Sequence, residues 1–98
     1  MTRLLVADEV RLDLDRIIDH LLEHDVAEPG ERIDAILTAI GALALNPLMG
    51  RPAHDTLREL VIGQGTRGYI ALYRYSEALD QVMILALRAQ QEAGYRHP

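Results

Sequence analysis

The stretch QVMILAL, residues 81–87, is the most apolar run of the chain, and it anchors the predicted fold. Apolar side chains occupy both of its alternating faces, which is typical of a covered strand in the centre of a sheet. Two runs rich in strand-forming residues precede it, at 57–62 and 69–75, and each is joined to the next run by a short connection. The sequence therefore predicts a three-stranded antiparallel meander over about 57–87.

Before the meander, the apolar residues recur with a helical period. One stripe starts at Asp8, the expected N-cap, and a second follows a break at 26–30 and is ended by Pro47. The expected inward side chains are Val10, Leu14, Ile17, Ile18, Leu21 and Leu22 in the first helix and Ile33, Ile36, Leu37, Ile40, Leu43 and Ala44 in the second. These stripes predict an antiparallel helical hairpin over about 8–45, preceded by a short strand at 2–7.

The composition is typical of one small domain with a hydrophobic core. The chain has 98 residues, of which 49% are hydrophobic, so a single domain over 1–98 is expected. The absence of cysteine removes disulfides, thiol catalysis and thiolate metal sites. No apolar run approaches the roughly 18 residues of a membrane helix, and charge appears too early for a secretory signal. We therefore expect a cytoplasmic α+β domain without membrane contact, in which a helical hairpin packs on a mostly antiparallel sheet.

The charge is divided unevenly between the two halves of the chain. All ten basic residues are arginines. Residues 1–49 hold four arginines against ten acidic residues, whereas residues 50–98 hold six against five. An acidic half is a poor general binder of nucleic acid, because phosphate contacts need concentrated positive charge. The second half can still place several arginines on one face of the sheet.

Two local patterns resemble cofactor or metal sites but lack part of the required context. GQGTRG at 63–68 has the glycine spacing of a dinucleotide loop, yet that loop needs a helix after it and a strand is expected here. His20 and His24 share one helix face and could bind zinc if a third ligand were present. That face is the polar side, and the glutamate that follows the first histidine in the metalloprotease motif is missing. We expect a hairpin connection, solvated histidines, and neither cofactor nor metal.

Arginine and tyrosine side chains are concentrated in the predicted sheet and its flanks. The candidates for one basic and aromatic surface are Arg58, Arg67, Arg74, Arg88 and Tyr95. Arginine beside tyrosine can hold a phosphate and stack a base. Alternatively, these arginines are exposed and paired with Glu59, Glu77 and Asp80. The spacing alone leaves both interpretations open.

Several short motifs follow one another along the chain: NPLMGRP at 46–52, LREL at 57–60, GY at 68–69 with LYRY at 72–75, and ILALR at 84–88 with QQEAGY at 90–95. In these motifs and in the order of its elements, the chain resembles the RelE/ParE superfamily of toxins from type II toxin–antitoxin systems. The resemblance implies a small toxin that a cognate antitoxin neutralises in a hetero-oligomer. The residues then expected to bind a partner are Arg67, Arg74, Arg88 and Tyr95.

The two branches of this superfamily imply different mechanisms. RelE-like members cut mRNA on the ribosome, whereas ParE-like members inhibit DNA gyrase by protein contact. RelE-like sequences carry a basic residue after the Gly-Tyr of the middle strand and an arginine or histidine before the final tyrosine; Ile70 and Ala89 occupy these places here. Alanine cannot transfer a proton or stabilise charge at a phosphate. Either this chemistry was never used, or Ala89 marks an attenuated form.

The ParE-like branch is favoured by these two positions, by the long helical hairpin and by the acidic first half. One alternative is a ribosome-dependent mRNA endonuclease, and its catalytic candidates are Arg58, Arg74, Arg88 and Tyr95. A second alternative is a non-toxic interaction module that has the same fold.

Overall fold

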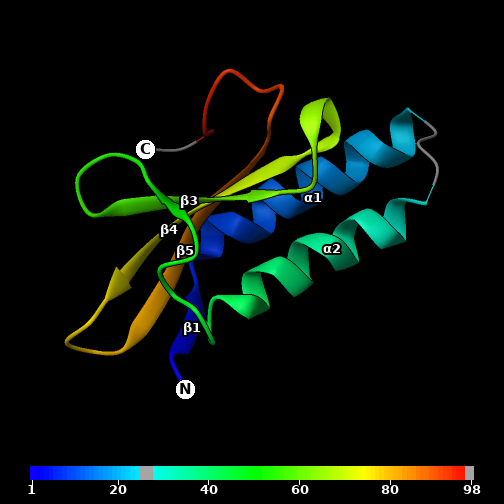
Figure 1. The fold of residues 1–98 in the computed structure, drawn as a ribbon. Helices are drawn as coiled ribbons and strands as arrows, with labels where there is room; N and C mark the ends of the chain where they lie inside the picture. The colour runs from blue at the N-terminus through cyan, green and yellow to red at the C-terminus, as the bar shows by residue number, and fades with distance from the viewer. Residues whose placement is uncertain (25–27, 97–98) are drawn as a thin grey trace.

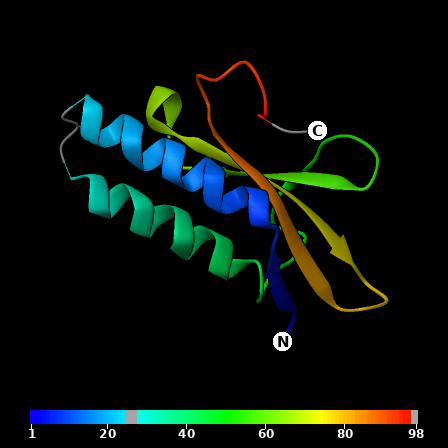
Figure 2. The same ribbon diagram turned by 180° about the vertical axis from the view of Figure 1, so that it is seen from behind.

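The structure, a computed structural model, describes residues 1–24 and 28–96. Its elements in chain order are β1 (Arg3–Val6), α1 (Asp8–Glu23), α2 (Pro29–Ala42), β2 (Arg51–Pro52), β3 (Leu57–Ile62), the 3-10 turn η1 (Gly65–Arg67), β4 (Tyr69–Ser76) and β5 (Gln81–Ala89). The two helices run antiparallel to each other and lie on one side of the sheet (Figure 1), and the view from behind shows the same arrangement (Figure 2). The predicted α+β fold is confirmed.

The strands form one mixed sheet in the order β1-β5-β4-β3-β2. β3, β4 and β5 are the predicted antiparallel meander, and β1 lies parallel to β5. β5 is therefore paired on both sides, as its apolar sequence suggests, although the central strand is β4. The edge strand β2 pairs with β3 over only two residues, which is too short to produce an alternating pattern in the sequence.

The connection between β3 and β4 contains more structure than a simple hairpin turn. Gly63 and Gly65 have φ angles of 79° and 58°, a region that glycine enters without steric cost. The 3-10 turn η1 follows, and the chain then enters β4 directly. Because a strand and not a helix comes after the glycines, the dinucleotide-loop interpretation lacks the helix N-terminus that it requires. The predicted strand-to-strand connection is confirmed.

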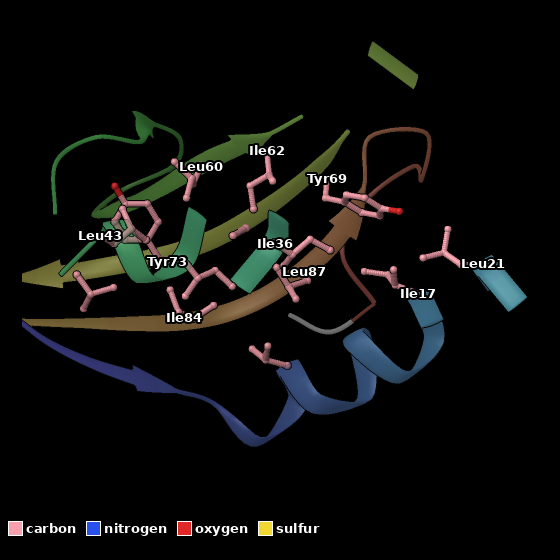
Figure 3. Packing of buried hydrophobic residues seen from close by; sticks show 14 residues of the cluster. Ile17, Leu21, Ile36, Leu43, Leu60, Ile62, Tyr69, Tyr73, Ile84 and Leu87 are labelled. Carbon is pink, nitrogen blue, oxygen red and sulfur yellow. The ribbon is translucent and has the colours of Figure 1, made fainter. Parts of the chain in front are cut away.

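The hydrophobic core lies between the two helices and the sheet (Figure 3). A bulge in the pairing of β4 and β5 changes the alternation, so that Ile84 and Leu87, an odd number of residues apart, both lie on the helix side. The side chains that are less than 2% exposed in this core belong to Leu21, Ile36, Leu43, Ala71, Tyr73, Val82, Ile84 and Leu87. Fully burying a large apolar side chain contributes roughly 1.5–3 kcal/mol, so these residues account for much of the driving force for folding.

Two leucines of the predicted inward stripes lie outside this core. Leu22 is 64% exposed and Leu37 is 52% exposed. Each follows a buried residue, Leu21 or Ile36, by one position, and one position is about 100° around a helix. The periodicity of the sequence locates the apolar stripe on the helix but does not determine how far around the helix the buried residues extend. The prediction was therefore wrong for both leucines.

The helix ends differ from the predicted ones by a few residues. The N-cap of α1 is Ala7, so Asp8 lies in the first turn, where its negative charge suits the positive end of the helix. α2 ends at Ala42, before the predicted end at residue 45. The predicted break at 26–30 falls partly on residues 25–27, outside the described residues. Neither helix of the described ranges has the length and hydropathy that a membrane span requires.

Candidate functional site on the outer face of the sheet

One face of the sheet points away from the helices and carries most of the predicted site residues. Strand pairing places Glu59, Leu72 and Ala86 in one row across this face. Ile70 and Arg88 lie opposite each other in the next row. Because these positions alternate with the core residues of β4, their side chains point to the side that the helices leave open. We call this side the outer face.

The chain end after β5, residues 90–96, folds back over the outer face. The Tyr95 hydroxyl donates a hydrogen bond of 2.6 Å to Oε2 of Glu59. The guanidinium carbon of Arg88 lies 5.1 Å from the centre of the Tyr95 ring, within the range of a cation–π contact. Strand β3, strand β5 and the chain end thus meet at one aromatic residue, and the predicted proximity of Arg88 and Tyr95 is observed.

Arg88 also fixes the path of this chain end. Its Nη1 atom donates to the backbone carbonyls of Ala89, Gln90 and Glu92, at 3.3, 3.5 and 3.0 Å. These contacts hold the first residues after β5 in a tight turn. The guanidinium is therefore engaged by backbone carbonyls on one side and by the Tyr95 ring on the other.

The Tyr95 hydroxyl is held in its protonated form. Burial raises the pKa of Tyr95 well above its ordinary value, and the neighbouring Glu59 carboxylate raises it further. Arg88 acts in the opposite direction without cancelling these effects. In this arrangement the hydroxyl is a hydrogen-bond donor to Glu59 and not a group ready to accept a proton.

Where β5 continues past the end of β1, charged side chains of α1 take the place of a neighbouring strand. β1 stops pairing at Val6, opposite Ile84, so the next backbone groups of β5 have no strand beside them. The Leu87 N–H donates to Oδ2 of Asp13 at 2.9 Å, and Nη1 of Arg16 binds the other oxygen of this carboxylate at 2.7 Å. Asp13 is fully buried and was not predicted, although an acidic residue within an apolar helical stripe is a visible signal.

Glu92 continues this edge and ties the chain end to α1. Its Oε2 atom accepts the Ala89 N–H at 2.7 Å, and its carboxylate lies 3.1 Å from Arg16 and 3.4 Å from Arg96. Burial tends to raise the pKa of Glu92, but the Ala89 N–H and the Arg16 guanidinium together lower it below the ordinary value. Glu92 is thus a carboxylate that the fold holds in its charged form.

Arg58 lies on the helix side of the sheet, apart from the outer face. It pairs with Tyr73, whose side chain is buried in the core. Nη1 of Arg58 donates to the carbonyl of Gly50 at 2.6 Å, and the Tyr73 hydroxyl donates to the carbonyl of Pro47 at 2.8 Å. The Gly50 N–H in turn donates to the Tyr73 hydroxyl at 2.9 Å. The conspicuous NPLMGRP motif therefore anchors a loop on the core.

Gly50 is required at its position by the close approach of this loop. A Cβ atom at Gly50 would lie 2.6 Å from Cε1 of Tyr73 and 2.8 Å from the carbonyl oxygen of Glu59. Both distances are shorter than van der Waals contact. Burial raises the pKa of the Tyr73 hydroxyl above its ordinary value, which is consistent with a structural role for its hydrogen bonds.

Ala89 and Arg67 lie at the same end of the sheet but face the helices. Ala89 is the last residue of β5, is half-buried and pairs with Tyr69. β5 extends two residues beyond the predicted end at 87, and the chain end folds back beside Ala89. Arg67 lies in η1 and lines a cavity of about 440 Å³ together with Ala89.

The structure thus separates the residues predicted to share one surface. Arg88 and Tyr95 are in contact, and Arg74 is exposed on the same outer face, opposite Met83 and far along β4 from Ile70. Arg58 and Arg67 lie on the helix side. Sequence alone misses this division, since the register, the bulge and the turn η1 decide which way each side chain points.

None of the four candidate arginines, Arg58, Arg67, Arg74 and Arg88, forms the expected ion pair with Glu59, Glu77 or Asp80 within the described ranges 1–24 and 28–96. Glu59 binds Arg51 at 3.2 Å in addition to Tyr95. Asp80 accepts hydrogen bonds from the hydroxyls of Thr2 and Tyr75, at 2.7 and 3.2 Å. The Thr2 hydroxyl is the main cause that lowers the pKa of Asp80.

His20 and His24 are exposed and interact with each other. Their ring centres are 4.2 Å apart, and Nδ1 of His24 lies 3.0 Å from the backbone oxygen of His20. Across residues 1–24 and 28–96, no group of three or more histidine and acidic side chains is arranged to hold a metal ion. That the protein needs no metal or cofactor stays a prediction.

Comparisons with known proteins agree with this architecture. Residues 4–94 match the family model described as the ParE toxin of the type II toxin–antitoxin system parDE. In three dimensions the chain is similar to a metal-bound toxin from Helicobacter pylori, with a TM-score of 0.50 and 12% identity, over 96% of this chain and 100% of that one. At this identity the similarity concerns the fold alone. No curated protein matches the sequence.

Proposed function

This chain belongs to the ParE toxin family of type II toxin–antitoxin systems, and on that premise we propose that it inhibits DNA gyrase by protein contact and is neutralised by a cognate antitoxin. The family match extends over residues 4–94 and therefore includes both helices, all of the sheet except Arg3, and most of the chain end. Because gyrase acts on chromosomal DNA, the proposal also places the protein in the bacterial cytoplasm.

The observation that carries the choice of gyrase over mRNA is the state of Tyr95. Cleavage of RNA through its 2′-hydroxyl needs a group that accepts a proton and cations that stabilise the charged phosphate. The Tyr95 hydroxyl donates its hydrogen to the Glu59 carboxylate at 2.6 Å, so this hydroxyl is engaged within the protein. The Glu59 carboxylate would also repel an approaching phosphate. Tyr95 therefore acts as a structural link between β3 and the chain end.

The other candidates for a nuclease site support the same choice. Arg58 donates to the carbonyl of Gly50 on the helix side, away from Arg88 and Tyr95. Arg88 is occupied by three backbone carbonyls of the chain end. Ala89, at the position where RelE-like sequences carry a basic residue, offers neither proton nor charge. Of the nuclease candidates, this leaves Arg74, and a single exposed arginine does not form a catalytic site.

We propose that the antitoxin binds around the chain-end side of the sheet. The predicted partner-binding residues Arg74, Arg88 and Tyr95 belong to the outer face, whereas Arg67 lies on the helix side. An antitoxin that contacts all four has to reach both faces of the sheet, and it has to extend along β4 from the chain-end side to Arg74. Substitution of Arg67 and of Arg74 should then each weaken the complex, although the two residues lie on opposite sides of the sheet.

Expression without antitoxin, in cells and with two variants, tests the proposal. We expect growth inhibition with a DNA-damage response and intact mRNA for the wild-type chain. The Ala89→His variant, which supplies the basic residue that RelE-like members carry, should also leave mRNA intact, because Tyr95 and Arg88 remain engaged. Rapid loss of mRNA without a DNA-damage response would contradict the choice of gyrase. Absence of any growth inhibition would indicate a non-toxic interaction module.

A further inference from the structure

A cavity of about 440 Å³ lies on the helix side, between α1, the start of α2, η1 and the chain end. Its volume is within the range of small-molecule binding sites, roughly 300–1,000 Å³. Four of the ten arginines of the chain, Arg16, Arg32, Arg67 and Arg96, line it, although the whole chain has a net charge of -5. Such a concentration of positive charge in an acidic protein indicates an anionic ligand.

The positive charges of this cavity are only partly neutralised by the protein. Arg16 forms ion pairs with Asp13 and Glu92, and Arg96 forms one with Glu92. Two carboxylates thus balance two arginines. Arg32 and Arg67 form no ion pair with any residue of the described ranges 1–24 and 28–96. About two positive charges are left for a ligand.

Tyr69 adds a polar group that lacks a partner. Its side chain lines the cavity and is 7% exposed, and its hydroxyl makes no hydrogen bond to the described part of the chain. In Figure 3 the Tyr69 hydroxyl points towards the side on which Ile17 and Leu21 lie. The hydroxyl is open to the cavity, and a tyrosine hydroxyl that shares a cavity with two arginines free of ion pairs within residues 1–24 and 28–96 is suited to bind a ligand oxygen. Ile17 and Leu21 supply an apolar wall beside it.

We propose that this cavity binds a small phosphate monoester. Arg32 and Arg67 bind the phosphate, the Tyr69 hydroxyl donates to one of its oxygens, and the apolar body of the ligand packs on Ile17 and Leu21. A phosphate monoester carries a charge of about -1.5 to -2 near neutral pH, which matches the two uncompensated arginines better than the single charge of a carboxylate does. The planar guanidinium fork also matches the geometry of phosphate oxygens.

This site is independent of the proposed action on gyrase. It lies on the helix side, whereas Arg88, Tyr95 and Arg74 belong to the outer face; Arg67 is shared with the proposed antitoxin contact, and no gyrase contact is proposed for it. Binding is measured on the purified chain without gyrase or antitoxin. Failure of the phosphate proposal therefore leaves the gyrase proposal unaffected, and the reverse also holds.

Calorimetric titration of the purified chain with phenyl phosphate, inorganic phosphate and benzoate tests the site. Phenyl phosphate should bind most tightly, since it combines the double charge with an apolar body. Benzoate has a similar ring but one charge, and inorganic phosphate has the charge but no ring. The absence of phenyl phosphate binding at millimolar concentration, or tighter binding of benzoate, would overturn the proposal.

Three variants and one matched control locate the binding. Arg32→Gln and Arg67→Gln should each weaken phenyl phosphate binding roughly 10- to 150-fold, because each removes hydrogen bonds between charged groups. Tyr69→Phe, which keeps the ring in the core, should weaken it roughly 2- to 10-fold. Arg74→Gln removes the same charge from the outer face and should have less than about a twofold effect. Equal losses for Arg74→Gln and Arg67→Gln would mean general attraction to a charged surface and would overturn the site.

Discussion

Three charged side chains, those of Asp13, Arg16 and Glu92, form hydrogen bonds to the edge of strand β5. β5 continues beyond the end of β1, and these side chains bind the backbone groups that another strand would otherwise bind. The carboxylates replace lost backbone partners, so their burial costs little compared with an unpaired charge. The position of Asp13 in an apolar stripe hinted at this role. Nothing in the sequence indicated that Glu92 would meet a residue 76 positions away.

Glu92 should make the stability of the fold depend on pH. Its pKa is lower in the folded chain than in the unfolded chain, where it is about 4.3. Such a group contributes stability above its unfolded pKa and loses it as the pH falls through the folded pKa. We therefore expect Glu92→Gln to be less stable than wild type near pH 7, and the difference to shrink as the pH falls below about 4.3.

Denaturant unfolding of both chains at neutral and acidic pH measures this difference. Glu77→Gln is the control, because Glu77 is exposed in the turn between β4 and β5. It should follow the wild-type curve at every pH. A constant difference between Glu92→Gln and wild type across the acidic range would show that the Glu92 charge is not involved.

At the scale of elements, the helices are held by narrow apolar stripes. Ile36 in α2 is 0% exposed, whereas the next residue, Leu37, is 52% exposed. Periodicity predicted both as core, since the two positions differ by about 100° around the helix. Only the packing of α2 on the sheet decides between them. The strands show the same limit, because the bulge in β5 shifts its alternation and no local sequence signal marks it.

Alanine substitutions at these neighbouring positions should have very different effects. Ile36→Ala removes buried side-chain atoms and leaves a cavity, and we expect it to lower the free energy of unfolding by roughly 2–5 kcal/mol. Leu37→Ala should change the free energy of unfolding by no more than about 0.5 kcal/mol. Chemical denaturation measures both variants against wild type. Similar losses at the two positions would mean that α2 packs on the sheet in a different rotation.

For the whole molecule, sequence predicted the elements and their order better than the assembly of the site. The helical hairpin and the three-strand meander follow from local periodicity, and both are confirmed. The parallel pairing of β1 with β5 and the short strand β2 depend on contacts between distant segments. For the same reason, the five basic and aromatic candidates of one predicted surface are divided between two faces. The family, carried by several short motifs in order, is confirmed by the match over residues 4–94.

The proposed inhibition of gyrase makes this fold a scaffold for protein contact. Tyr95 and Arg88 order the chain end, and Arg58 orders the loop after α2, so the proposal gives these residues the task of shaping the contact surfaces. Disturbing them should alter binding to gyrase or antitoxin through the shape of the chain end. On this proposal, toxicity should increase with the amount of toxin–gyrase complex and should not depend on a rate of mRNA cleavage.

Supercoiling of relaxed plasmid DNA by purified gyrase, with and without the purified chain, is the most direct measurement of this function. We predict that the chain inhibits supercoiling in proportion to its concentration, that added cognate antitoxin restores it, and that DNA without gyrase is left intact. Full supercoiling activity at an excess of the chain, together with cleavage of ribosome-bound mRNA by the same preparation, would contradict the proposal.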